Sequence, residues 1–137
     1  MFDELQEGVH KIATWYREEA RNPEVDPNLI VHAQQKITSY IATIGAQEIT
    51  AKREATHKKL DYEYQHYTCV ERVKNDLKCS NAEADRVSEL ETFKLKENYK
   101  IAEDNHHAWK QLYMYSKILW EQLRSHLSYL KNQMGNE

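Results

Sequence analysis

The chain has 137 residues, a formal net charge of −3, 40% hydrophobic residues and 30% charged residues. This length fits one domain, residues 1–137, and the small net charge excludes a surface that is basic throughout, so a nucleic-acid site must be a local patch. Only three Gly and two Pro are present, which favours long regular elements with few turns. We expect long, exposed helices that gain part of their stability by oligomerisation.

The first predicted element is an amphipathic helix over about residues 3–21, because apolar residues recur there at steps of three and four. These residues are Phe2, Leu5, Val9, Ile12 and Tyr16. The stretch RNPEVDPN, which contains both prolines, then ends the helix. Asp26 is a good N-cap and Pro27 a good first position for the next helix.

A second helix is predicted over 27–77, where apolar residues keep a period near 3.5 and no strong breaker occurs, although Gly45 offers a place for a bend or break. Ser80 and Glu83 then form a capping box that opens a third helix over 81–134. Its apolar positions include Leu90, Ile101 and Tyr115, and Gly135 is a suitable stop.

Two long helices joined by a short turn predict an antiparallel, coiled-coil-like hairpin in which facing residue numbers add to about 158. The resulting fold class is all-α, with a short N-terminal helix lying over the apolar end of the hairpin. The stretch WKQLYMYSKILW, residues 109–120, is apolar on nearly all sides. We therefore expect a homo-oligomer that assembles through this end of the hairpin, by Trp109, Tyr113, Leu119, Trp120, Leu123 and Leu127.

The middle of the hairpin is basic and aromatic. At one level the two long helices carry seven cations, Lys52, Arg53, Lys58, Lys59, Lys94, Lys96 and Lys100, with His57, Tyr62 and Tyr64 beside them. Cations that track a backbone, mixed with rings on which bases stack, form single-strand binding surfaces. The alternative is a solvated face whose lysines pair with Asp61, Glu63 and Glu97 at helical spacings.

Other chemistry has weaker support. The sequence has no Gly-rich phosphate loop and no G-x-S-x-G motif, so we expect neither an enzyme nor a cofactor. The E-x-x-H pairs Glu54/His57 and Glu103/His106 nearly face each other in the predicted register. A metal-binding helical bundle is therefore an alternative, although an oligomer would have to supply further carboxylates.

The compartment follows from the cysteines and the apolar runs. Cys69 and Cys79 do not make a disulfide framework, and the sequence shows no signal peptide, so a reducing cytoplasm is expected. Apolar runs of only about four or five residues predict no membrane span.

A family likeness rests on the basic stretch. KREATHKKLDYEY, residues 52–64, resembles the basic helix segment of the UvsY recombination mediators of T-even-type phages, in which a basic pair runs into Leu-Asp-Tyr. The opening DELQEGVHK, residues 3–11, is similar to the family's Asp-Leu-Gln-Glu start. ENYKIAEDN, residues 97–105, corresponds to an acidic, lysine-rich stretch that precedes a Trp-bearing C-terminal helix.

This resemblance implies a non-enzymatic protein of the phage-infected bacterial cytoplasm. It would form a ring-shaped homo-oligomer, a heptamer, bind single-stranded DNA, and help a RecA-like phage recombinase replace the phage single-stranded DNA-binding protein. The family's DNA-contacting basic pair falls on His57 and Lys59. His57 replaces a lysine, so either Lys58 takes over its contact or binding is weaker and sensitive to pH.

The predicted DNA-binding set combines the resemblance with the charge pattern. It consists of Lys52, Arg53, His57, Lys58, Lys59, Tyr62, Tyr64, Lys94, Lys96 and Lys100. A different class of function stays open beside it: a coiled-coil adaptor or phage-encoded inhibitor that binds a host protein and no DNA. That alternative predicts no salt-sensitive binding to single strands.

Overall fold

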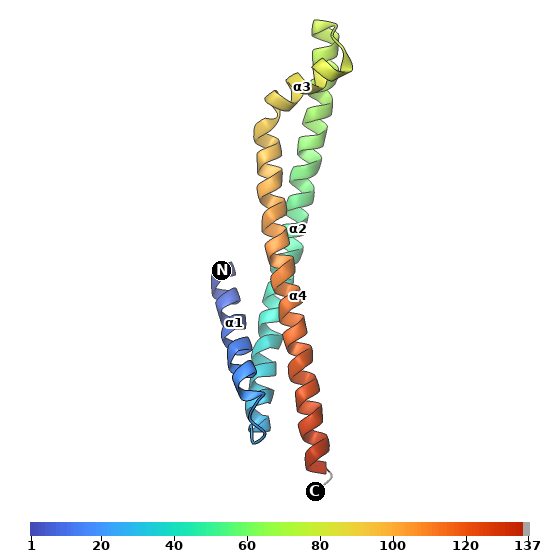
Figure 1. The fold of residues 1–137 in the computed structure, drawn as a ribbon. Helices are drawn as coiled ribbons and strands as arrows, with labels where there is room; N and C mark the ends of the chain where they lie inside the picture. The colour runs from blue at the N-terminus through green and yellow to red at the C-terminus, as the bar shows by residue number, and fades with distance from the viewer. Residues whose placement is uncertain (136–137) are drawn as a thin grey trace. The chain divides into compact units, whose positions relative to one another are not determined.

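The computed structural model describes residues 1–135, which form helices and contain no β-strand (Figure 1). The all-α prediction is confirmed. The helices are α1 (Phe2–Glu19), α2 (Pro27–Leu77), α3 (Asn81–Glu91) and α4 (Phe93–Gly135). α2 has the predicted bounds, and α4 ends at the predicted glycine, whereas α1 ends at Glu19 instead of about residue 21.

The single helix predicted over 81–134 is wrong, because the chain breaks at Thr92 and forms α3 and α4. At the break, the carbonyl oxygen of Ser88 accepts two hydrogen bonds from Thr92, one from the backbone N–H at 2.9 Å and one from the hydroxyl at 2.7 Å. A threonine hydroxyl that bonds back to the preceding turn bends helices. Threonine is not a strong breaker by propensity, so the sequence pattern runs through this position without a signal.

The helix starts carry the predicted caps. Asp26 Oδ1 accepts a hydrogen bond from the backbone N–H of Asn28 at 2.9 Å, and Ser80 Oγ accepts one from the backbone N–H of Glu83 at 3.2 Å. Between α2 and α3 the chain reverses at Lys78, whose φ is 49°. This left-handed conformation costs a non-glycine residue roughly 1–2 kcal/mol, so the turn is tight at the expense of local strain.

Contacts divide the chain into two compact units. Unit 1 consists of Met1–Glu48 with Trp109–Glu137, and unit 2 consists of Ile49–Ala108. The predicted DNA-binding residues all fall in unit 2, and the residues predicted to form the assembly surface all fall in unit 1.

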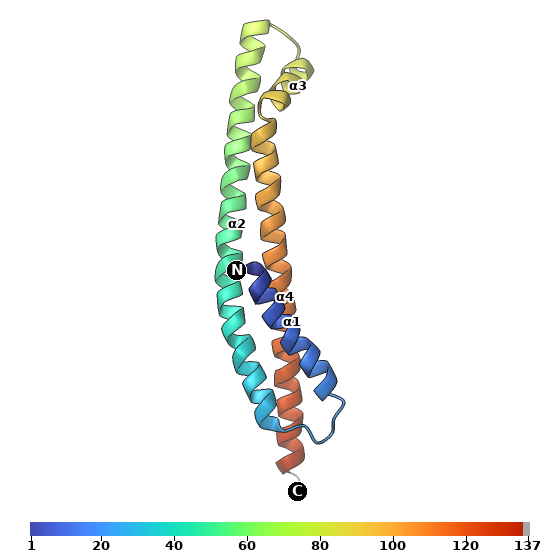
Figure 2. The same cartoon turned by 90° about the vertical axis from the view of Figure 1, so that its left-hand side faces the viewer.

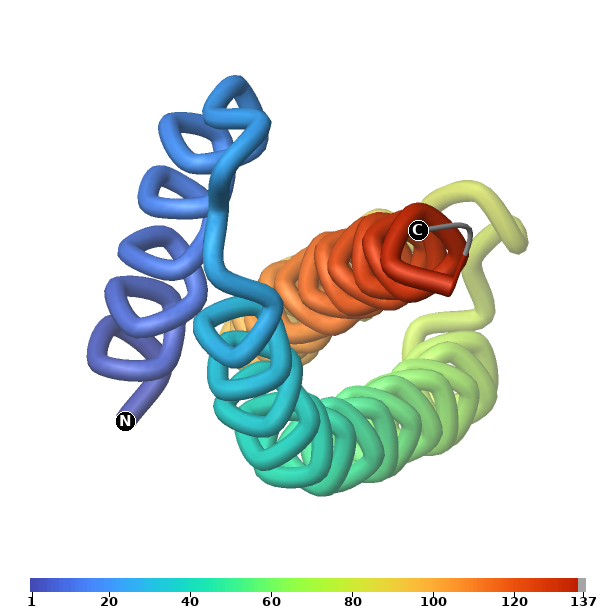
Figure 3. The backbone as a smooth tube through the Cα atoms, turned by 90° about the horizontal axis from the view of Figure 1, so that it is seen from below, coloured from blue at the N-terminus to red at the C-terminus, as the bar shows by residue number. Residues whose placement is uncertain are grey.

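Unit 1 packs α1, the start of α2 and the end of α4 side by side (Figures 2 and 3). All three segments contribute to one aliphatic core, whose largest fully buried apolar side chains are Val9, Ile30, Ile37, Ile44 and Leu123. Burying a side chain of this size stabilises a fold by roughly 1.5–3 kcal/mol relative to leaving it exposed. Unit 1 is therefore held mainly by apolar packing.

Two glycines allow close helix contacts in unit 1. A Cβ atom at Gly8 would lie 2.6 Å from the hydroxyl oxygen of Tyr40, and one at Gly45 would lie 3.1 Å from Cε2 of Tyr113. α2 continues through Gly45 without a break, so this glycine provides space for the Tyr113 ring. The numbers of Gly45 and Tyr113 add to 158, which agrees with the predicted register within this unit.

Unit 2 combines the later part of α2 with α3 and the start of α4, and its interior contains much smaller side chains. Its buried apolar residues are Ala51, Ala55, Cys69, Val73, Ala84 and Ala102. Two residues predicted as apolar interior are instead exposed, Leu90 by 75% and Ile101 by 62%, and Leu77 at the end of α2 is exposed by 64%. Unit 2 therefore buries little apolar area and leaves large apolar side chains on its surface.

Candidate nucleic-acid interface

The predicted cations do not form one continuous belt, because they project from different faces of their helices. On α2, Ala51, Ala55 and Tyr62 face the interior of unit 2. Given 100° per residue, Arg53 and His57 point away from that interior, whereas Lys52 and Lys59 lie on one flank of it. The seven cations are thus shared among several surfaces of unit 2.

Three of the cations are engaged in helical ion pairs. Lys58 Nζ lies 3.8 Å from Glu54 Oε1, Lys94 Nζ lies 3.6 Å from Glu97 Oε2, and Lys100 Nζ lies 3.8 Å from Glu103 Oε1. Exposed pairs of this kind contribute little stability, but they offset the local positive charge. Within residues 1–135, the other four cations have no carboxylate within 4 Å: Lys52, Arg53, Lys59 and Lys96.

One flank of unit 2 mixes cations with carboxylates. The hydroxyl of Tyr99 donates a hydrogen bond to Glu103 Oε2 at 2.6 Å. This bond, together with the charges of Lys100 and Lys59, lowers the pKa of Glu103, and the same bond raises the pKa of Tyr99. Glu103 therefore stays ionised and weakens the attraction of this flank for phosphate.

Tyr62 does not offer a free ring. It stacks on Tyr99, with ring centroids 6.2 Å apart and planes 10° apart, and it also contacts the ring of His66 at 5.7 Å. Tyr62 is half-buried, and its aromatic face serves contacts between helices. The structure therefore assigns Tyr62 to packing in unit 2, which argues against its predicted role in base stacking.

Exposed rings lie instead on the outward side of α2. Tyr64 is 67% exposed, and Tyr67 and Leu60 are exposed by 66% and 60%. Residues 53, 57, 60, 64 and 67 recur at steps of four and three and so share one helix face. We call Arg53, His57, Leu60, Tyr64 and Tyr67 the outer α2 face. It extends about 21 Å at 1.5 Å per residue, with Arg53 and His57 at one end and the two tyrosine rings at the other.

Tyr67 is absent from the predicted set, although a sequence signal for it exists. It follows Tyr64 by three residues and Leu60 by seven, which is the spacing of neighbours along a helix stripe. Lys58, on the flank of α2 opposite Lys59, lines a surface hollow with Arg53, His57, Glu54 and Asp61. Two acids therefore border the basic end of the outer α2 face.

The residues predicted to form the assembly surface lie largely inside unit 1. Trp109, Leu119 and Leu123 are buried, and Trp109 receives the ring of Phe2 edge-on at 4.9 Å. The indole N–H of Trp120 donates to Thr38 Oγ1 at 3.0 Å. The half-buried members are Tyr113, Trp120 and Leu127. This burial argues against their forming a subunit interface, because three-helix packing covers them within the chain.

α4 carries a second apolar face that the sequence analysis did not separate from the first. Its exposed members are Met114 (54%), Tyr115 (44%), Ile118 (56%) and Tyr129 (59%). Tyr115 was predicted to be interior, and its exposure is a correction. Residues 109–120 are apolar on nearly all sides because one side of the helix packs into the core of unit 1 and another side forms an exposed apolar surface.

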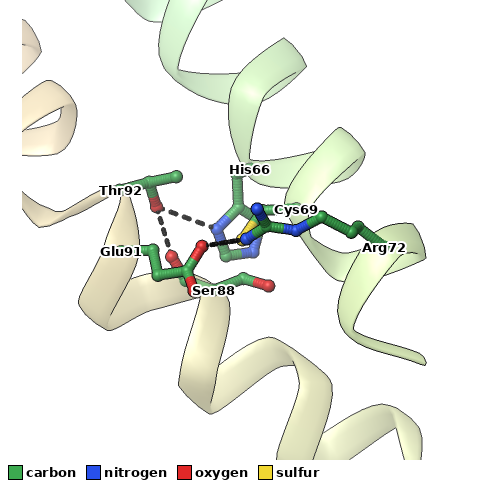
Figure 4. A network of polar contacts seen from close by, with 6 residues as sticks. All are labelled: His66, Cys69, Arg72, Ser88, Glu91 and Thr92. Atoms are coloured by element: carbon green, nitrogen blue, oxygen red, sulfur yellow. Dashed lines mark hydrogen bonds and ion pairs between the residues drawn. The ribbon is translucent and has the colours of Figure 1, made fainter. Parts of the chain in front are cut away.

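Polar side chains link α2 to α3 and to the break at Thr92 (Figure 4). His66 Nδ1 lies 3.3 Å from Thr92 Oγ1, and its Nε2 lies 2.9 Å from Asp85 Oδ1. The thiol of Cys69 donates to Glu91 Oε2 at 2.9 Å. Sequence reasoning missed this network, because its members are scattered along the chain and carry no motif.

The same network fixes the charge of a surface carboxylate. Arg72 forms an ion pair with Glu91 and donates to Cys69 Sγ at 3.5 Å. The hydrogen bond from Cys69 and the charge of Arg72 lower the pKa of Glu91. The hydrogen bond to Cys69 and the charge of Glu91 raise the pKa of Arg72. α2 and α3 are therefore joined by the ion pair between Arg72 and Glu91, and the thiol of Cys69 contacts both members of the pair.

Asp85, His66 and Thr92 resemble a carboxylate–imidazole–hydroxyl relay, but the arrangement is unsuited to nucleophilic catalysis. Thr92 is only 5% exposed, and its hydroxyl donates to the carbonyl oxygen of Ser88. A nucleophile needs access to substrate and a base that removes its proton. The three side chains therefore serve a structural role, because their contacts hold α2 against α3 and the break at Thr92.

The E-x-x-H pairs do not converge on a metal site. Glu54 pairs with Lys58, and Glu103 binds Tyr99 and Lys100. Across residues 1–135, no group of three or more His, Cys, Asp or Glu side chains is placed to hold a metal ion. In the same range, no helix combines the length and the apolar character needed to cross a membrane.

No family model, curated protein or solved structure matches this chain.

Proposed function

We propose that this chain is a non-enzymatic single-stranded DNA-binding protein of the recombination-mediator type. The observation that carries the proposal is the outer α2 face. There, Arg53 has no carboxylate within 4 Å in the described chain, and the exposed rings of Tyr64 and Tyr67 follow on the same helix face. Single-strand binding surfaces combine such cations with rings on which bases stack.

The outer α2 face makes two kinds of contact with DNA, one with phosphates and one with bases. Arg53 and His57 approach phosphates at one end, while Tyr64 and Tyr67 stack on bases at the other. Lys52 and Lys59 add phosphate contacts on the adjoining flank, where Glu103 limits their effect. Aromatic stacking tolerates any base, and phosphate contacts carry no sequence information. The surface therefore binds single strands without strong base preference.

The mediator role adds assembly to this surface. One chain offers few cations, so a homo-oligomer of long antiparallel hairpins, a ring by the family resemblance, multiplies phosphate contacts along one strand. Such an assembly holds single-stranded DNA while a RecA-like phage recombinase replaces the phage single-stranded DNA-binding protein. It works in the cytoplasm of the infected bacterium and needs no cofactor.

A double substitution tests the DNA surface. Arg53→Ala with Tyr64→Ala removes one phosphate-binding cation and one stacking ring. Since stacking contributes about 1–3 kcal/mol per base, affinity for oligo-dT should fall roughly tenfold or more. The slope of log affinity against log salt should also become shallower by about one, because Arg53 no longer neutralises a phosphate.

Two variants serve as controls for this test. Tyr64→Phe keeps the ring and should bind like the parent, whereas Lys94→Ala removes a cation already paired with Glu97 and should change binding little. If the double variant binds like the parent, the outer α2 face is not the site. If the parent shows no salt-sensitive binding to oligo-dT, the proposed function itself fails.

The same face favours a second candidate from another class. Ile49 and Leu60, exposed by 56% and 60%, make it an apolar stripe that a partner helix can also cover. An adaptor or inhibitor of a host protein would use it in this way. That candidate predicts that the parent protein binds oligo-dT at neither low nor high salt.

A further inference from the structure

A groove runs between α1 and α4 in unit 1. Two adjoining hollows of about 760 and 600 Å³ form it, and Tyr16, Ala20, Ile118 and Gln122 line both. The Tyr16 hydroxyl donates to the carbonyl oxygen of Gln122 at 3.4 Å, which ties α1 to α4 beneath the groove. We call this surface the α1–α4 groove.

The walls of the groove are apolar and aromatic, and they stay uncovered. Ile118 is 56% exposed and Tyr129 is 59% exposed, and Tyr115 lines the same surface. Patches of large exposed apolar side chains mark interaction sites. A helix that inserts two or three apolar side chains is the kind of ligand that fits a groove between helices.

The rim of the groove is mainly basic. Arg17 on α1 and Arg21, two residues beyond the end of α1, border it on one side, and Lys117 on α4 borders it on the other. The single lining carboxylate, Glu121, lies 3.6 Å from Arg124 and is partly neutralised. Complementary potentials favour an acidic partner at such a surface.

α3 offers a helix with the matching properties. Leu90 has the largest exposed fraction among the exposed large hydrophobic residues of the described chain, 75%, and Phe93, which begins α4 just after the break at Thr92, is exposed by 63%. Glu83 and Glu89 are exposed on α3, with Arg86 as its one cation. Asp85 and Glu91, by contrast, bind His66 and Arg72 within the chain.

We propose that the α1–α4 groove of one copy receives, from a second copy, the surface formed by Leu90 of α3 and Phe93 at the start of α4. We call this surface the α3 face. Leu90 and Phe93 enter beside Ile118 and Tyr129, and the acids of α3 meet the basic rim. Arg86 is the counterpart of Glu121. The contact rests on the homo-oligomer in the proposed function, and it is independent of DNA binding.

This contact joins two different surfaces, so it is heterologous. In a pair of copies, one copy keeps an unused α3 face and the other keeps an unused groove, so the assembly grows until it closes into a ring or continues as a filament. An isologous contact, in which the exposed faces of two α4 helices meet, would stop at two copies. The two arrangements therefore predict different masses and different responses to substitution.

The test uses two variants that change only exposed side chains. The groove variant carries Arg21→Ser with Ile118→Ser, and the α3 variant carries Leu90→Ser with Phe93→Ser. A control variant, Ile101→Ser with Met134→Ser, removes equally exposed apolar side chains elsewhere, at 62% and 65%. Circular dichroism checks that each variant keeps its helices, and light scattering coupled to size exclusion measures mass.

The expected result has three parts. The parent and the control variant are oligomers, and each test variant alone has the mass of one chain. A mixture of the two variants gives a two-chain species and nothing larger, because only one intact groove and one intact α3 face can meet. A parent with the mass of one chain, or an α3 variant that keeps the parent's mass, overturns the proposal.

A separate binding measurement on the same samples tests the proposed DNA function. Titration of oligo-dT with the parent and with the one-chain variants reports binding by the outer α2 face. A parent that assembles as expected but binds no oligo-dT contradicts the DNA function and leaves the α3 contact standing. A parent that binds oligo-dT while both test variants keep its mass contradicts the α3 contact alone.

Discussion

Unit 1 and unit 2 are built from the same two long helices, yet they bury different kinds of side chain. Unit 1 buries Ile30, Ile37, Ile44 and Leu123, whereas the corresponding positions of unit 2 hold mainly alanines. The cause is α1, which adds a third helix to unit 1 and covers more apolar surface. In unit 2, small interior residues and a polar network take the place of that core.

The difference bears on function. Because the interior of unit 2 is small, its larger apolar and aromatic residues remain outside, where they are available to a ligand. The outer α2 face and the exposed Leu90 and Phe93 are both examples. Stability that depends on hydrogen bonds and ion pairs is also more sensitive to pH than apolar packing is. The stability of unit 1 should therefore change little with pH, whereas the stability of unit 2 should depend on pH.

The largest expected effect comes from truncating a core side chain in unit 1. Leu123 is fully buried, so Leu123→Ala should destabilise the protein by about 2–5 kcal/mol through reduced burial and a cavity. Denaturant unfolding followed by circular dichroism at one fixed protein concentration measures the change. Leu130→Ala, at a half-buried position of the same helix, is the control. A destabilisation below about 1 kcal/mol for Leu123→Ala would show that unit 1 is loosely packed.

A smaller effect should follow from breaking the polar network of unit 2. Thr92→Val keeps the shape of the side chain but removes the hydroxyl that faces His66 Nδ1. A polar group left without its partner typically costs about 1–3 kcal/mol. Hydrogen exchange should show faster opening in α3 and in residues 62–73 of α2, with unit 1 unchanged. Equal acceleration in both units would contradict the separation of their stabilising forces.

Features set by local chemistry could be predicted from the sequence. These features depend only on contacts between residues close in the sequence. They are the proline at the start of α2, the caps Asp26 and Ser80, and the glycine at the end of α4, and each lies at its predicted position. The helix break at Thr92 could not be predicted in this way. Its hydroxyl also faces His66, which lies 26 residues away, so the conformation depends on tertiary contacts.

The phase of α4 shows a second limit. Ile101 and Tyr115 carry the apolar signal, yet Ala102 and Ser116 occupy the interior positions beside them. Small residues give no hydrophobic signal even where they are buried, so the pattern selects their larger neighbours.

The candidate site follows the same rule. The sequence shows that its cations and rings are close in the chain, but it does not distinguish Tyr62 from Tyr64. That distinction depends on Tyr99, which stacks on Tyr62 and leaves Tyr64 exposed.

The smallest expected effect is a response of unit 2 to acid. The pKa of Glu91 is lowered from 4.5 by Cys69 and Arg72, so the folded state holds its proton more weakly than the unfolded state does. The stabilisation from this carboxylate is therefore present above the unfolded pKa and is lost as the pH falls through the folded value. Because the side chains are exposed, the effect should be modest, and salt should reduce it.

Comparing two glutamine variants isolates this acid response. Glu91→Gln should flatten the decline of stability between about pH 5 and pH 3, whereas Glu71→Gln, a neighbouring exposed position on α2, should leave the decline unchanged. Hydrogen exchange at each pH assigns the change to α3 and the end of α2, while unit 1 keeps its protection. If unit 1 lost protection at the same pH as unit 2, apolar packing would not distinguish the two units. The shared loss of stability in acid would then have to arise from the charge of the whole chain.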